Sequence, residues 1–246
     1  MMNILKSEFY KLKHTWVPWA HFILPVLYAL FFYWAATMTS LKNFSDMDII
    51  KNYFVLLGAV LPIICGVITS KVVDMEASAG RFQVMLSTTK SRSKAYGGKL
   101  IMLLLSFLFS ISLAVFIFAM LFGNQRTMAW LIELLLVFIG CLSTYMIHLC
   151  VSLMLGGGAS IGLGFVETLL ALLSITNLGE NIWYFLPCTW ASRLSATYIV
   201  GSELADSSYL IKEFTMWGYV AIPITVVIFT GSLLWFNRWG GKSISE

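Results

Sequence analysis

The chain has 246 residues, of which 59% are hydrophobic and 11% charged, and its formal net charge is +4. Soluble domains contain roughly 45–50% apolar and about 25% charged residues, so this composition excludes an ordinary soluble protein. It predicts an all-α polytopic membrane protein. Because the sequence shows no internal repeat and no low-complexity linker, we expect a single transmembrane domain over residues 1–246.

The first predicted element is an amphipathic helix over residues 1–15. Its large apolar residues are spaced by four, three and four positions and therefore share one helical face, away from the nearby lysines. They are Leu5, Phe9, Leu12 and Trp16. Such a helix suits the inner surface of the membrane. A short basic flank that only sets the topology is the alternative interpretation.

Six apolar segments follow, each close to the roughly 20 residues that a membrane-spanning helix needs. They are Trp16–Thr37, Tyr53–Thr69, Leu100–Phe122, Ala129–Leu155, Ala159–Ile175 and Trp217–Phe236. Most lysines and arginines lie before the first span, between the second and third, and after the last. The positive-inside rule then predicts that both termini are cytoplasmic.

The loop of residues 71–99, between the second and third spans, is rich in charge. Its pattern fits a short amphipathic helix followed by a polar turn, which would need the bilayer surface or a partner's groove to cover its apolar side. An ordinary solvated, positively charged loop is the alternative. The candidate contact residues are Asp74, Glu76, Gly80, Arg81, Ser91 and Arg92.

Ionisable residues inside a bilayer are costly and suggest function. Glu133 and His148 lie in the fourth span, and Glu167 lies in the fifth. His148 and Glu167 are equally far in sequence from the turn at 157–158, so they would pair if the two spans form an antiparallel hairpin. The alternative is that this pair only stabilises the hairpin.

The glycine-rich run at 156–164 is not a phosphate-binding loop, because it lies between two apolar spans. Gly158 and Gly162 instead have the small-xxx-small spacing that allows membrane helices to approach closely. The Gly-Lys-Ser triplet at 241–243 has Phe236 where a P-loop needs its first glycine. We therefore expect no cofactor on this chain, with ATP and Mg²⁺ bound by a separate ATPase subunit.

The segment 177–216 is the longest predicted outside the membrane. It combines aromatic residues, among them Trp183, Tyr184 and Trp190, with several carboxylates. Aromatic rings at this level usually form an interfacial belt. Alternatively, the rings and carboxylates bind an amphipathic, cationic peptide at the outer leaflet. In that case Trp183, Tyr184 and Trp190 join Glu133, His148 and Glu167 as candidate residues of a substrate pathway.

Three stretches of sequence resemble the permease subunits of lantibiotic-immunity ABC transporters, which are ABC-2 type exporters. They are residues 3–13 (NILKSEFYKLK), the loop acids with Gly80, Leu86 and Ser91-Arg92 before Lys99, and residues 183–190 (WYFLPCTW). The resemblance implies six transmembrane helices, a cytoplasmic coupling helix after the second, and a partly re-entrant segment before the last. It also implies that the region around Asp74, Glu76, Gly80 and Arg81 docks on the ATPase.

An enzymatic function is not expected. A zinc site needs clustered ligands, but His14, His21 and His148 are scattered, so no metal site is predicted. The expected function is ATP-driven removal of a lantibiotic or related peptide, with an ATPase and a second permease chain (a homodimer or heterodimer) in the lipid bilayer and no nucleic-acid partner. The alternatives are export of bacitracin, another hydrophobic drug or a lipid, and a non-transporting membrane scaffold.

Overall fold

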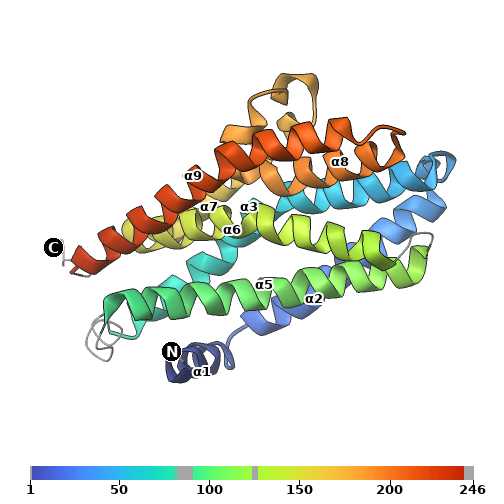
Figure 1. Ribbon diagram of the computed structural model, residues 1–246. Coiled ribbons are helices and arrows are strands. Elements are labelled where there is room, and N and C mark those ends of the chain that lie inside the picture. The colour runs from blue at the N-terminus through green and yellow to red at the C-terminus, as the bar shows by residue number, and fades with distance from the viewer. Residues whose placement is uncertain (1, 81, 83–90, 124–126, 241–246) are drawn as a thin grey trace.

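The computed structural model describes residues 2–80, 82, 91–123 and 127–240, and within these residues helices are the only regular elements (Figure 1). The α-helices are α1 (Met2–Leu12), α2 (Val17–Met38), α3 (Asp46–Ser78), α5 (Arg92–Phe122), α6 (Thr127–Leu155), α7 (Gly157–Ser174), α8 (Trp190–Glu203) and α9 (Ser208–Arg238). Short 3-10 helices are η1 (Ser40–Asn43), η2 (Asn177–Gly179), η3 (Trp183–Phe185) and η4 (Pro187–Thr189).

The prediction of six spans is confirmed, because α2, α3, α5, α6, α7 and α9 are each long and apolar enough to cross a membrane. Several predicted boundaries are wrong. α3, α5 and α9 have 33, 31 and 31 residues because polar residues at their ends remain helical. At the start of α3, Ser45 Oγ accepts a hydrogen bond from the Asp48 backbone N–H at 3.1 Å, which caps the helix.

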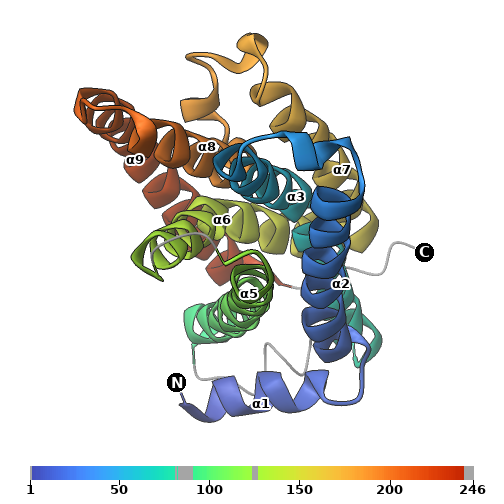
Figure 2. The same cartoon turned by 90° about the vertical axis from the view of Figure 1, so that its right-hand side faces the viewer.

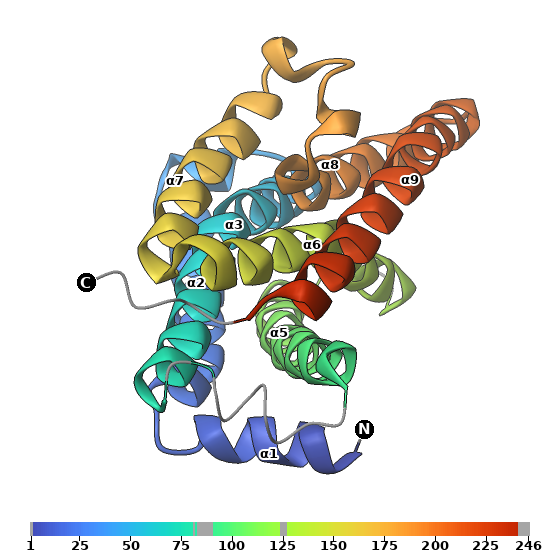
Figure 3. The same cartoon turned by 90° about the vertical axis from the view of Figure 1, so that its left-hand side faces the viewer.

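The N-terminal helix α1 ends at Leu12, earlier than the expected limit near residue 15. Figures 2 and 3 show α1 lying across the ends of α2 and α5. Leu12 is buried, whereas Phe9 is 41% exposed and Trp16, beyond the helix, is 44% exposed. α1 packs closely on α5, because a Cβ at Gly98 would lie only 2.5 Å from Ile4 Cγ2. Contact of α1 with a membrane surface stays a prediction.

The central helix is α3. In its apolar 18-residue stretch 72% of the residues are buried, against 28% in α2 and 17% in α9. It packs most extensively on α7. A Cβ at Gly66 would lie 2.6 Å from Ser160 O, and one at Gly164 would lie 2.7 Å from Pro62 O. These glycines therefore bring the backbones of α3 and α7 into direct contact.

The close approach expected at Gly158 and Gly162 is not found among the residues that the structure describes. Among the described residues, nothing lies within 4 Å of a Cβ placed at either glycine. Gly157 and Gly164 are the positions of the run that face α3 instead. The two glycines that contact α3 are seven residues apart, and a shift of one or two residues on a helix moves a position to another face.

The segment before α9 returns into the bundle, as expected of a partly re-entrant element. α8 packs on α3 and α6, where a Cβ at Gly58 would lie 2.7 Å from Ala191 C and one at Gly140 2.6 Å from Ala191 Cα. Gly58 is about 18 Å along α3 from its first residue, at about 1.5 Å per residue. α8 therefore starts deep between α3 and α6 (Figure 1).

Candidate functional site

Four charged side chains meet where α1 approaches α3 and α5. We call Glu8, Lys11, Glu76 and Lys99 the four-charge cluster. Lys99 Nζ donates to Glu8 Oε2 at 2.5 Å and to Glu76 Oε1 at 2.9 Å. Lys11 Nζ donates to Glu8 Oε1 and to Glu76 Oε1, both at 2.6 Å. Each ammonium group therefore bridges both carboxylates, and three helices are joined at one point.

Burial makes the pairing in this cluster necessary. Glu8, Glu76 and Lys99 are only 5%, 7% and 2% exposed, and buried charges persist only when they are paired and hydrogen-bonded. Lys11 is partly exposed. Burial alone would lower the pKa of Lys11, but its hydrogen bonds to Glu76 and Glu8 and their negative charges raise that pKa overall. Lys11 therefore keeps its positive charge at neutral pH.

Asp74 is the other predicted contact residue on α3, and Gly80 follows the end of that helix. Asp74 is exposed and accepts a hydrogen bond from Ser70 Oγ at 3.2 Å. A Cβ at Gly157 would lie 2.5 Å from Asp74 Oδ2, so this carboxylate sits beside the first turn of α7, where the helix dipole favours negative charge. Gly80 has a φ of 122°, which glycine adopts readily. Arg81 lies outside the described residues.

Ser91 and Arg92 begin α5 at the same end of the bundle. The Ser91 carbonyl accepts hydrogen bonds from the first turn of α5. Arg92 Nη1 donates to Asn237 O at 3.1 Å and to Trp239 O at 2.7 Å, which stabilises the C-terminal end of α9. The centroids of the Phe82 and Trp239 rings are 4.9 Å apart. Arg92 thus has a partner inside the chain, and its contact with an ATPase stays a prediction.

A second buried polar group lies between α3, α6 and α7. His148 Nε2 is 2.9 Å from Glu167 Oε2, and His148 Nδ1 is 2.8 Å from Ser160 Oγ. Thr69 Oγ1 is 3.1 Å from Ser160 Oγ, and Ser152 Oγ donates to Thr69 Oγ1 at 3.2 Å. We call these five residues the His148 network. The predicted pairing of His148 with Glu167 is confirmed, whereas a role in transport stays a prediction.

Glu133 is a third buried carboxylate, with a different environment. It is 1% exposed, and neither of its oxygens has a hydrogen-bond partner among the described residues. Ser195 Oγ, on the neighbouring α8, is also buried without a partner among the residues that the structure covers. Glu133 does not meet His148 or Glu167 in any hydrogen bond of the described chain, so the structure brings together only two of the three ionisable candidates.

The aromatic residues of the segment 177–216 form a small core. Trp183, Tyr184 and Trp190 are 1%, 7% and 1% exposed. Trp190 Nε1 donates to Tyr184 O at 3.0 Å, and Tyr184 OH donates to Glu213 Oε2 at 2.5 Å. Burial, together with this hydrogen bond and the charge of Glu213, raises the pKa of Tyr184 to about 12. A peptide at the surface does not reach these rings in this conformation, and their part in a substrate pathway stays a prediction.

Glu8, Lys11 and Lys99 are not among the site residues predicted from the sequence. Glu8 is the one acidic residue among the first 15, and Lys99 immediately precedes an apolar run. An acid in a basic segment together with a lysine at a span boundary was the available signal. Glu8 lies three residues after Leu5 and four before Leu12, so it borders the apolar stripe of α1 and is buried with Leu12.

No group of three or more His, Cys, Asp or Glu side chains that could hold a metal ion occurs among the described residues. No curated protein and no solved structure matches the chain. Residues 4–170 match the family described as ABC-2 family transporter protein. This match covers more than half of the sequence and runs from α1 through most of α7. The chain therefore belongs to the ABC-2 family of transporter proteins, as a helical membrane permease.

Proposed function

We propose that this permease is one subunit of an ATP-driven exporter that removes a lantibiotic or a related antimicrobial peptide from a bacterial plasma membrane. It works with a separate ATPase, which binds ATP and Mg²⁺, and with a second permease chain. Both termini are cytoplasmic in this proposal. Membership of the ABC-2 family supports the architecture, and the resemblance of residues 3–13 and 183–190 to lantibiotic-immunity permeases supports the cargo.

The observation that carries the transport proposal is the four-charge cluster. Glu76 lies near the end of α3 and Lys99 near the start of α5, on the two sides of the predicted coupling loop. Glu8 and Lys11 connect both helices to α1. A partner that displaces this loop would therefore move α1, α3 and α5 together. Separating any of these helices would leave a buried charge without its ion-pair partner, which is strongly unfavourable.

The proposed mechanism follows from this connection. Closure of the nucleotide-loaded ATPase dimer displaces the loop around Asp74–Arg92, and the three connected helices move as one body. α3 transmits this movement to α7 and α8, which it contacts through Gly66, Gly164 and Gly58. The pathway between two permease chains is thereby opened alternately to the two sides of the membrane.

The exposed surface of the segment 177–216 supports a peptide cargo better than its buried rings do. Leu178, Ile182 and Phe185 are 76%, 55% and 60% exposed, and Glu180 is exposed beside them. Apolar side chains next to a carboxylate would contact both faces of a cationic amphipathic peptide. The same surface is compatible with bacitracin, another hydrophobic drug or a lipid, which remain the alternative cargoes.

The test is growth of a sensitive Gram-positive strain that expresses the chain with a partner ATPase and second permease. The strain is challenged with lantibiotics, bacitracin and unrelated drugs, and the control carries an ATPase whose P-loop lysine is replaced. We expect protection against lantibiotics that disappears in the control. Protection against other compounds alone would overturn the cargo, and protection that survives in the control would favour a scaffold over a transporter.

A further inference from the structure

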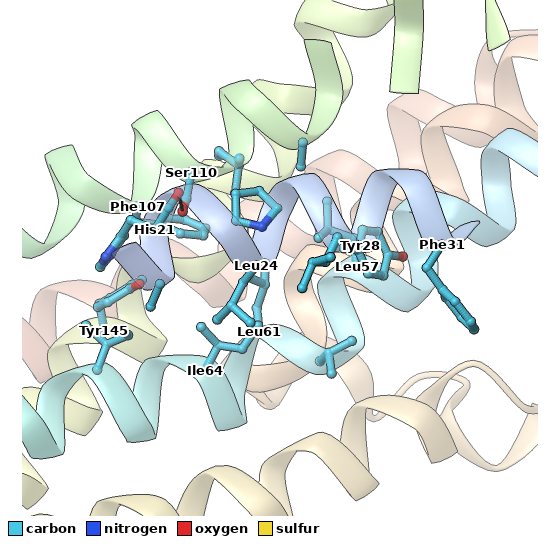
Figure 4. Close-up of a pocket in the computed structure, with 17 residues that line it drawn as sticks. His21, Leu24, Tyr28, Phe31, Leu57, Leu61, Ile64, Phe107, Ser110 and Tyr145 are labelled. Atoms are coloured by element: carbon cyan, nitrogen blue, oxygen red, sulfur yellow. Dashed lines mark hydrogen bonds between the residues drawn. The ribbon is translucent and has the colours of Figure 1, made fainter. Parts of the chain in front are cut away.

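A cavity of about 350 Å³ lies between α2, α3 and α5, with Tyr145 of α6 at one end (Figure 4). Small-molecule sites in proteins have volumes of roughly 300–1,000 Å³ and mostly apolar walls. Along α2 the lining runs from Ala20 to Phe31, which corresponds to about 16 Å at about 1.5 Å per residue. None of the residues expected to form a substrate pathway lines it.

The cavity exists because α2 packs closely on α5 and only lightly on α3. The polar atoms in its walls are mostly engaged elsewhere. Tyr28 OH donates to Tyr53 O at 2.7 Å, and Ser110 Oγ donates to His21 O at 2.7 Å. His21 Nδ1 is 2.8 Å from Val17 O, and because a carbonyl only accepts, Nδ1 carries the hydrogen. The interior is therefore essentially hydrocarbon, and a cavity of this kind does not hold water.

The walls and the mouth of the cavity differ in exposure. Leu61 and Ile111 line it although they are only 4% and 2% exposed. At the mouth, Leu24 and Phe31 are 45% and 65% exposed. Both mouth residues belong to α2, a candidate membrane span, so the medium outside the opening is lipid.

We propose that this cavity binds one acyl chain of a membrane phospholipid. The polar end of the lipid lies toward α1, where a second cavity of about 320 Å³, lined by Phe9, Leu12 and His21, shares His21 with the first. Lys13, next to Leu12, is exposed and suits a phosphate group at the membrane surface. His21 Nε2, opposite the bonded Nδ1, offers a further polar contact near the junction of the two cavities.

The bound chain occupies the space between α2 and α3 and so stabilises the orientation of α2, the span adjoining α1. This proposal does not depend on the identity of the cargo or on the partner ATPase. It assigns a lipid site to the outer surface of a single permease chain.

The test uses the full-length permease in nanodiscs of phosphatidylglycerol that contain a small fraction of the same lipid with a photoactivatable diazirine in one acyl chain. Mass spectrometry after illumination maps the labelled residues. We expect labelling of the buried walls at Leu61 and Ile111. Val227, which is 68% exposed on α9, reports labelling by bulk lipid.

Two matched variants test the site. Leu24→Trp places a large ring at the mouth, whereas Ile23→Trp places the same ring at a neighbouring position that is equally exposed, at 46%, and does not line the cavity. Loss of contact with as few as about two methylenes weakens binding roughly tenfold, so wall labelling relative to Val227 should fall about tenfold in Leu24→Trp only.

Three results would overturn the proposal: no labelling of Leu61 or Ile111 in the unchanged protein, equal labelling in the two variants, or displacement of the lipid probe by an apolar peptide carrying the same diazirine. Labelling of Val227 normalises each variant for reaction with bulk lipid. Native mass spectrometry of the unchanged permease, which needs no variant, should in addition detect one retained phospholipid per chain.

Discussion

The four-charge cluster and the His148 network both bury carboxylates between helices, but they stabilise them differently. At the end of the bundle, Glu8 and Glu76 are bridged by two ammonium groups. Deeper in the bundle, Glu167 meets an imidazole that is itself bonded to a hydroxyl. The cost of a full charge rises toward the bilayer centre, so ion pairs suit the end and polar hydrogen bonds suit the interior.

The largest expected effect is at Lys99. Lys99→Met leaves Glu8 and Glu76 buried with only Lys11 between them, and breaking a buried ion pair on one side costs about 3–5 kcal/mol. The free energy of unfolding should fall by that amount, measured by thermal or denaturant unfolding in detergent.

Lys94→Met is the matched control, because Lys94 is exposed on the same helix. Surface substitutions usually change stability by less than about 0.5 kcal/mol. Equal destabilisation by the two lysine variants would show that the cluster is no stronger than a surface charge.

A smaller effect is expected in the His148 network. His148→Leu or Glu167→Leu alone leaves a buried polar partner unpaired, which costs about 1–3 kcal/mol. The double variant should be milder than the sum of the two, with a coupling energy of about 0.5–3 kcal/mol in a double-mutant cycle. Strict additivity of the two losses would contradict the pairing.

A substitution at Gly157 tests how α7 packs on the stretch of α3 between the four-charge cluster and the His148 network. A Cβ there would collide with Ser70 and Asp74, which lie between Thr69 of the network and Glu76 of the cluster. Gly157→Ala should lower the free energy of unfolding by about 1–3 kcal/mol, as overpacking does.

Gly158→Ala is the control for this substitution, because a Cβ at that position meets open space. Replacing a helical glycine by alanine raises helix stability by up to about 1 kcal/mol. If both alanine variants unfold at the same denaturant concentration, the contact between Gly157 and α3 does not limit stability.

The smallest change, and one of opposite sign, is expected at Glu133. This carboxyl is buried with no hydrogen-bond partner among the described residues, so Glu133→Gln exchanges an ionisable group for a neutral one of similar size. We expect a gain of up to about 1 kcal/mol, within the range of single hydrogen-bond effects. A loss comparable to that of Lys99→Met in the same unfolding assay would indicate that Glu133 has a charged partner.

The sequence predicted the spans well because long apolar runs have few other stable outcomes in a chain of this composition. The ends were less accurate, since the stretches 46–52 and 71–78 contain charged residues and are nevertheless helical in α3. Hydropathy measures preference for lipid and does not separate a polar helix end from a loop. Helix capping at Ser45 was the local signal that could have moved the first of these boundaries.

The site was predictable where sequence distance translated directly into geometry. His148 and Glu167 are separated by one tight turn, so equal spacing was enough to pair them. Glu8 and Lys99 are 91 residues apart and belong to helices that cross, and nothing in local periodicity specifies such a crossing. Arg92 and Trp239 are 147 residues apart and meet for the same reason.

The long separation within the four-charge cluster also has a consequence for biosynthesis. Glu8 leaves the ribosome 91 residues before Lys99, its partner across the cluster. At about 5–20 residues per second, α1 waits roughly 5–18 s for Lys99 to be synthesised. During that interval Glu8 and Lys11 must stay hydrated, so final docking of α1 follows synthesis of two spans, α2 and α3, and of the first turns of α5.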